Sequence, residues 1–275
     1  MARDVQLGRS VITPRESRVK FSKLSMSLCV AAALAVSGSA LAKGGVSGGG
    51  GGGGGGGKTA NVLLGTDLGL YVVDMPFPGE ASISGWVLAR LDTGFAPADF
   101  VVTLNGVPLV APGGLGSLIY VVDPNGPQPT IGADNMLHIV ASSVSQRASR
   151  QMDLKCPARA VVATDPGVGS NLGGAGTLDM AWTALPQNTN FALIGNYIPF
   201  PTATLYSYDL ATGAQAGTVS KATLDQSSTS TSLSVGPSAS SGYVAELAYP
   251  GVHQITDPTD AGGWCGRKQR YIYMQ

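Results

Sequence analysis

From Asn61 to the C-terminus, no stretch of ten or more residues places apolar side chains at helical spacing. Short apolar or alternating runs recur instead, each closed by Gly, Pro, Asn or Asp, the residues that turns require. This pattern predicts an all-β fold in which short strands pack as sandwiches. The expected strands cover residues 62–64, 69–73, 82–90, 100–104, 107–110, 117–122, 137–143, 160–164, 177–183, 191–194, 203–208, 216–222, 230–235, 243–248 and 270–274.

The turns between these runs have specific chemistry. Asn105-Gly106 lies between two expected strands, and this dipeptide readily adopts the two positive φ angles of a type I′ hairpin. Residues 123–126 (DPNG) predict a second turn. Because side chains alternate along a strand, we expect Val102 and Leu104 to face the core.

About seven expected strands lie on each side of residues 149–157, a stretch that is charged and poor in apolar residues. We therefore predict a boundary there, with one sandwich over residues 59–155 and a second over residues 156–275. Each half has roughly 100 to 120 residues, the size at which a single sandwich closes on its own core.

The first 42 residues have the pattern of a secretory signal peptide. Six basic residues precede an uncharged apolar run over residues 24–36, and Ala40-Leu41-Ala42 has the form that signal peptidase cuts. This run is too short to span a bilayer, so we expect no membrane span after cleavage. Residues 43–58, with ten consecutive glycines at 48–57, predict a flexible linker. The expected location is the periplasm, the cell surface or the medium.

The charge composition narrows the range of partners. Charged residues make up only 12% of the chain, with 17 basic and 17 acidic residues. Cleavage after Ala42 would remove six basic and two acidic residues and leave a net charge near −4. A sparse and mildly acidic surface excludes nucleic-acid binding through a basic face.

Cys156 and Cys265 are the cysteines that remain after cleavage. Two cysteines in an exported chain favour one disulfide over a zinc site, which needs more ligands. The bond would close a loop of more than 100 residues and stabilise the fold by up to about 4–5 kcal/mol in the chain-entropy model.

The expected mature chain offers few groups for catalysis. From Asn61 onward it has no Gly-x-Ser-x-Gly motif, and its histidines, His138 and His253, lie in different halves. Its only glutamates, Glu80 and Glu246, would have to face each other across a cleft to act as a glycosidase pair. We therefore predict a protein that is not an enzyme and has no cofactor.

Asp257 and Asp260 form a weak candidate calcium site. Acidic oxygens in a loop of an exported β module are ligands that Ca²⁺ accepts, but this loop has too few of them. A role in turn formation is the alternative for both residues and for Asp123.

Basic residues cluster around both cysteines, so a disulfide would draw two basic groups together. We predict a local patch at the junction of the halves that binds an anionic glycan or an acidic protein. The alternative is that nearby aspartates neutralise the patch in surface ion pairs. The patch comprises Arg147, Arg150, Lys155, Arg159, Trp264, Arg267, Lys268, Arg270, Tyr271 and Tyr273.

The second half resembles a fibronectin type III-like module. Residues 178–186 (LDMAWTALP) are similar to the second strand of that family, with an inward Trp182, and residues 230–235 (STSLSV) and 242–247 (GYVAEL) are similar to its penultimate strand pair, with Tyr243 in the core. The first half resembles a bacterial immunoglobulin-like module in residues 84–87, 101–109 and 133–141. These resemblances imply binding, spacing or display, and no shared catalytic residues.

We therefore expect an exported, non-enzymatic protein of the bacterial envelope that binds a protein or glycan partner, with adhesion as one form of this function. Two alternatives remain at this point. One is a small secreted hydrolase with a carboxylate site, and the other is a fibre subunit that self-associates by β-strand addition.

Overall fold

The structure is a computed structural model, and it describes residues 60–64, 68–94, 99–113, 118–173, 176–187, 200–237, 241–252, 254–257 and 261–275. Every regular element in these ranges is a β-strand, which confirms the all-β class. No helix that could cross a membrane occurs there. The expected signal peptide, the glycine linker and the strand expected at 191–194 lie outside the described residues.

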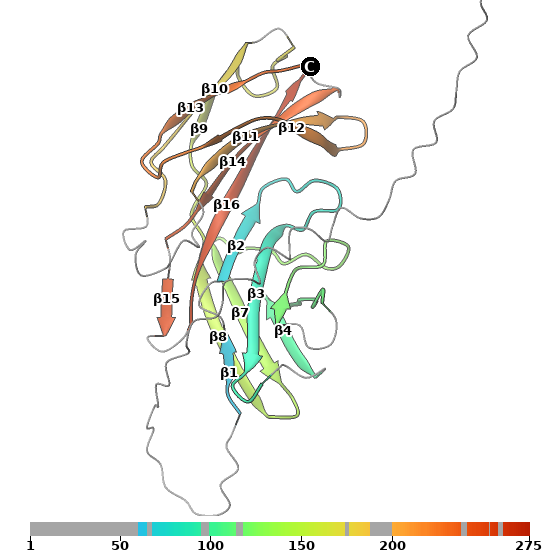
Figure 1. The fold of residues 1–275 in the computed structure, drawn as a ribbon, viewed down its shortest axis with the longest axis vertical. Helices are drawn as coiled ribbons and strands as arrows, with labels where there is room; N and C mark the ends of the chain where they lie inside the picture. Colours follow the sequence, from blue (N-terminus) through green and yellow to red (C-terminus); the bar gives the residue numbers. More distant parts are fainter. Residues whose placement is uncertain are drawn as a thin grey trace, which may run out of the picture. The chain divides into compact units, whose positions relative to one another are not determined.

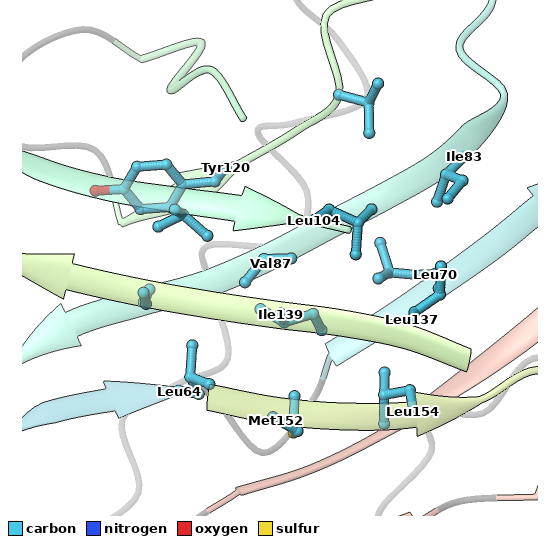
Figure 2. Close-up of a cluster of buried hydrophobic side chains, with 14 of the residues drawn as sticks. Leu64, Leu70, Ile83, Val87, Leu104, Tyr120, Leu137, Ile139, Met152 and Leu154 are labelled. Carbon is cyan, nitrogen blue, oxygen red and sulfur yellow. The ribbon is translucent and has the colours of Figure 1, made fainter. Parts of the chain in front are cut away.

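Two sheets of the first half share one hydrophobic core. β3 (Ile83–Leu91) pairs with β1 (Val62–Leu64), β2 (Leu68–Val73) and β6 (Ile119–Tyr120). The other sheet has the order β5 (Val107–Pro108), β4 (Phe100–Leu104), β7 (Met136–Ser143) and β8 (Ala148–Lys155). Alternate side chains of both sheets, such as Leu70, Leu104 and Ile139, fill the space between them (Figure 2).

The second half has its own core between a three-stranded and a four-stranded set of strands. β13 (Ser230–Ser234), β10 (Thr177–Trp182) and β9 (Val162–Asp165) form the first set. The second set has the order β12 (Ala214–Thr223), β11 (Thr202–Asp209), β14 (Gly242–Pro250) and β16 (Ala261–Met274), and β15 (Gln254–Asp257) pairs with β16. Trp182, Leu205 and Tyr243 are buried in this core.

The last strand, β16, belongs to both halves. Residues 263–268 run parallel to β2, and residues 266–274 run antiparallel to β14 (Figure 1). A single nine-stranded sheet therefore contains strands from both sides of the predicted boundary. Cys265 packs in the first core and Tyr273 in the second. The division into two domains at 155/156 stays a prediction.

The turn chemistry is as expected. Asn105 and Gly106 have φ angles of 47° and 80° and join β4 to β5. Asp123 accepts a hydrogen bond on its side chain from the Asn125 N–H, and its carbonyl accepts one from the Gly126 N–H. Val102 and Leu104 face the core, as predicted from alternation.

The expected strands at 107–110 and 117–122 are shorter in the structure, as β5 and β6, and three other strands differ more from the prediction. Residues 149–157, expected to separate the halves without a strand, contain most of β8, in which the buried Met152 and Leu154 lie among charged neighbours. β16 begins at Ala261, well before the expected start at 270. The prediction missed this part of the strand because glycines interrupt its apolar pattern. β15 was not predicted, because it is short and has little apolar alternation.

Candidate functional site

The disulfide predicted between Cys156 and Cys265 is present, with Cα atoms 4.7 Å apart. Cys156 directly follows β8, and Cys265 lies in the part of β16 that pairs with β2. Both side chains are buried. We call the surrounding region the junction, defined as residues 74–80, 156–160 and 265–270.

Arg267 is a buried cation on β16 that binds three segments of the chain. Its Nη1 donates to Asp74 Oδ1 at 2.9 Å, and its Nη2 donates to Asn135 Oδ1 at 3.0 Å. Its Nε donates to the carbonyl oxygen of Pro157 at 3.0 Å. Each nitrogen of the guanidinium has a partner, which a charged group needs when it is removed from water.

Arg270 lies on the opposite face of β16, because side chains alternate along a strand. Its guanidinium forms a bidentate pair with Glu80 at 2.5 and 3.1 Å and also binds Glu246 at 2.7 Å. The Cζ atom lies 3.9 Å from the centre of the Phe77 ring, a cation–π contact. Residues 74–80 are therefore held against both faces of β16.

Phe77 extends this contact to β11. Its ring lies edge-on to Tyr206, with centroids 6.0 Å apart, and 5.6 Å from the ring of Tyr208. The N–H of Phe77 donates to the Glu80 side chain, which fixes the carboxylate that receives Arg270. A segment of the first half thus packs on a strand of the second half through charge and aromatic surface together.

The ion pairs shift the pKa values of their members. Burial alone raises the pKa of Glu80, but hydrogen bonds from Arg270 and from the Phe77 backbone outweigh it and leave the pKa below its ordinary value of 4.5. Burial works to lower the pKa of Arg270, yet the hydrogen bonds and charges of Glu80 and Glu246 raise it. Both groups are therefore charged at neutral pH.

The ten residues of the predicted patch do not form one exposed surface. Four of them, Trp264, Arg267, Arg270 and Tyr273, are buried. Lys268 is partly buried and lies 4.0 Å from Glu80 and 5.4 Å from the ring centre of Tyr71. The buried arginines are neutralised by acids that are distant in sequence, rather than by the aspartates considered from sequence.

The remaining patch residues are more accessible. Arg147 and Lys155 are exposed, while Arg150 and Tyr271 are half-buried. Arg159 is 67% exposed, and its Nε lies 2.9 Å from Asp74 Oδ2. Because Asp74 also binds Arg267, one carboxylate serves two cations at the junction. No local sequence pattern links Asp74 to either arginine.

The two glutamates weighed as a hydrolase pair bind the same guanidinium. Glu246 is almost fully buried, and Arg270 lies between it and Glu80. A glycosidase needs one carboxylic acid that keeps its proton and a second carboxylate facing it across the substrate. Arg270 instead helps to keep Glu80 ionised, because its hydrogen bond and charge lower the pKa of that carboxyl.

The other candidates have simpler surroundings. His138 Nδ1 lies 2.7 Å from Asp153 Oδ1, and both side chains are more than half exposed. Asp260 and His253 lie outside the described residues, as does the side chain of Asp257. The described residues contain no group of three or more metal-ligating side chains.

A pocket of about 410 Å³ opens beside the junction. Proline, alanine and leucine dominate its walls, which are formed by residues 157–160 and 183–186. The hydroxyl of Tyr249, its largest side chain, already bonds with Gln269 and with the backbone of Ala158. Its other polar side chains, Arg159 and Thr183, are also engaged, by Asp74 and by the Val161 N–H, so few polar groups are left to orient a ligand.

No family model matches the chain, and no curated protein matches it either.

Proposed function

We propose that the chain is an exported, non-enzymatic binding or display protein of the bacterial envelope, in which two β-sandwich modules act as one stiff unit. The observation that carries this proposal is the shared strand β16, which pairs with β2 of the first half and β14 of the second. Modules joined by a linker alone move relative to each other by default. A shared sheet with a disulfide and buried ion pairs opposes that motion.

The strand order of the second half supports a fibronectin type III-like module. Strands β13-β10-β9 pack against strands β12-β11-β14-β16. Trp182 is buried in β10, and its indole N–H donates to the Ser228 carbonyl at 2.8 Å. The Tyr243 hydroxyl at the start of β14 donates to the Gly236 carbonyl, the arrangement known as a tyrosine corner.

The first half repeats this order, which supports an immunoglobulin-like module there. β2 and β6 both pair with β3, as β9 and β13 both pair with β10. The order β5-β4-β7-β8 corresponds to β12-β11-β14-β16. Two modules of one topology in series are suited to spacing and display rather than to enclosing an active site.

The edge of β16 that faces away from β14 is already bonded to other segments of the chain, which weighs against assembly by strand addition at this strand. β2 pairs with residues 263–268, and the segment 169–172 bonds with residues 272–274 of the same strand. An exposed edge needs free backbone groups to accept another chain. The Glu80–Arg270–Glu246 arrangement weighs against the hydrolase alternative for the reason given above.

The proposal is tested on the full precursor expressed in a Gram-negative host. We expect mass spectrometry of the periplasmic or surface fraction to find a chain that starts at Lys43 and has both cysteines blocked to alkylation. A chain that keeps its leader in the cytoplasm with two free thiols contradicts export. Release of sugars from envelope polysaccharide that disappears in Glu246→Gln contradicts the non-enzymatic assignment.

A further inference from the structure

The outer face of β3 places a large aromatic side chain in solvent. Trp86 is 47% exposed, whereas its neighbour Val87 and the next inward residue Ala89 are completely buried in the first core. The side chains of Ser84, Leu88 and Arg90 share the outer face with Trp86, because alternate residues of a strand lie on one side. Trp86 therefore contributes little to the core.

Aliphatic side chains continue this face across β6. Leu88 pairs with Ile119 on β6, and Val110 forms a bridge with Val121. Val110 is 42% exposed, and the other three are half-buried. We call this set the β3 platform; it comprises Trp86, Leu88, Arg90, Val110, Ile119 and Val121.

On its other side, Trp86 lies beside residues that have no side chain. Its partner on β2 is Gly69, where an added Cβ would lie 2.5 Å from the Trp264 indole. Gly85 has a φ of 121°, and a Cβ there would lie 2.2 Å from the Gly69 carbonyl oxygen. The Trp264 indole therefore occupies the space that a side chain at Gly69 would fill, in the row that pairs Trp264, Gly69 and Trp86 across the sheet.

Arg90 is the one charged side chain of the platform, and Asp92, just past the end of β3, accepts hydrogen bonds from Asn61. The segments β2, β3 and β6 contain no acidic residue, although the chain expected after cleavage has more acidic than basic residues. Within the described part of the chain, no ion pair involves Arg90. An anionic partner therefore complements this face better than a neutral or cationic one.

We propose that the β3 platform binds an acidic polysaccharide, with the apolar C–H face of a sugar ring on the Trp86 indole and a sugar carboxylate on Arg90. The two residues are four positions apart on a strand, about 13 Å, a span that a short oligosaccharide covers. This inference rests on the proposed binding function and names its ligand class and site.

The size of the surface favours a glycan over a protein partner. A stable protein interface buries about 800 Å² on each partner and uses roughly 20–30 residues a side. The platform instead offers one projecting aromatic ring, four aliphatic side chains and one cation on a sheet face. This combination suits a flat ring with an attached carboxylate.

The test measures binding of the full mature protein to polygalacturonate, with uncharged dextran as the matched neutral probe. We expect binding to polygalacturonate that weakens with salt, and weaker binding to dextran. Trp86→Ala should reduce affinity for polygalacturonate more than about tenfold, the effect of a central aromatic contact. Arg90→Ala should reduce it severalfold at low salt only.

Lys221→Ala is the control, because it removes an exposed basic residue that lies outside both the platform and the predicted patch. It should bind as the unchanged protein does, and all three variants should keep the wild-type unfolding midpoint. Binding that Trp86→Ala leaves intact overturns the platform but leaves the proposed function standing.

Two further outcomes also overturn the inference. One is a protein that binds neither polysaccharide. The other is a protein that dimerises through Trp86, with the dimer lost in Trp86→Ala on size-exclusion chromatography. Failure of the proposed function itself appears separately, as cytoplasmic retention of the precursor or as release of sugars from polysaccharide.

Discussion

The junction buries charged side chains, whereas the β3 platform exposes a large apolar one, and both depart from the usual distribution of side chains. At the junction, Arg267 and Arg270 are buried, as is Glu246 on β14, which binds Arg270, although charged residues are rarely found inside proteins. On the platform, Trp86 is half exposed although it is the largest apolar type of side chain. The buried charges all have partners, whereas Trp86 makes little contact with its own core.

This difference separates the structural role of the junction from the binding role that we propose for the platform. A buried charge is tolerated when its partners are fixed, so the junction charges specify how the two halves meet. The exposed part of the Trp86 ring is available to a partner, as we propose above. Changes at the junction should therefore reduce stability, and changes on the platform should reduce binding.

Loss of the disulfide should have the largest effect on stability. Removing the bond between Cys156 and Cys265 in a Cys156→Ala/Cys265→Ala variant should cost about 4–5 kcal/mol, because the bond closes a long loop in the unfolded chain. Denaturant unfolding with and without reductant measures this cost. The double variant is the control, since reductant should not affect it. An unchanged wild-type midpoint under reduction would show that the bond is not a major support of the junction.

Arg270→Ala should have the next largest effect. It leaves Glu246 buried without its cation, which costs about 3 kcal/mol or more in the free energy of unfolding. Chemical denaturation is the measurement, and the exposed Arg147→Ala should change stability by less than about 0.5 kcal/mol. Equal effects for the two arginines would remove the distinction between paired buried charge and solvated charge.

Gly69→Ala tests the close packing of β2 against Trp264, between the junction and the platform. The new methyl group would collide with the buried indole of Trp264, which packs edge-on against Tyr71 at 5.0 Å and has little room to move. We expect a loss of about 1–3 kcal/mol, as for other overpacked sites. Gly176→Ala is the matched control, because no atom lies within 4 Å of its added Cβ. Similar unfolding midpoints for the two variants would refute the close approach at Gly69.

Acidification should have the smallest effect of the four. The pKa of Glu80 is lower in the folded state than its ordinary 4.5, so its stabilising contribution is present above pH 4.5 and is lost as the pH falls through the folded value. Unfolding midpoints measured from neutral pH to values below 4.5 should therefore fall more steeply for wild type than for Glu80→Gln. Trp86→Ala should follow the wild-type curve, because it removes no titrating group. A Glu80→Gln profile that parallels wild type contradicts this account.

Strand prediction from sequence worked where local alternation was regular. The bounds of β4 agree with the prediction, since Val102 and Leu104 alternate with polar or exposed neighbours and Asn105-Gly106 ends the strand. The prediction missed β8, because two inward residues among charged neighbours give a weak pattern. It placed the start of β16 too late, because glycine has no side chain to reveal which face is buried.

The candidate site was predicted only in part. The cysteine pairing was correct, since few cysteines were present to choose from. The basic patch was expected to be a surface, yet Arg267 and Arg270 are buried against Asp74 and Glu80. More than 180 residues separate each arginine from its acid, so no spacing rule relates them.

The sequence by itself determined that this chain forms short, paired strands and which cysteines are joined, because alternation, turn residues and the number of thiols can be read without knowing which strands become neighbours. Only the tertiary structure decided which charges are buried and which tryptophan faces solvent. Burial depends on what lies beside a residue in space, and the pairing of β2 with β16 brings together segments from opposite ends of the described chain. That pairing covers Trp264 and leaves Trp86 exposed.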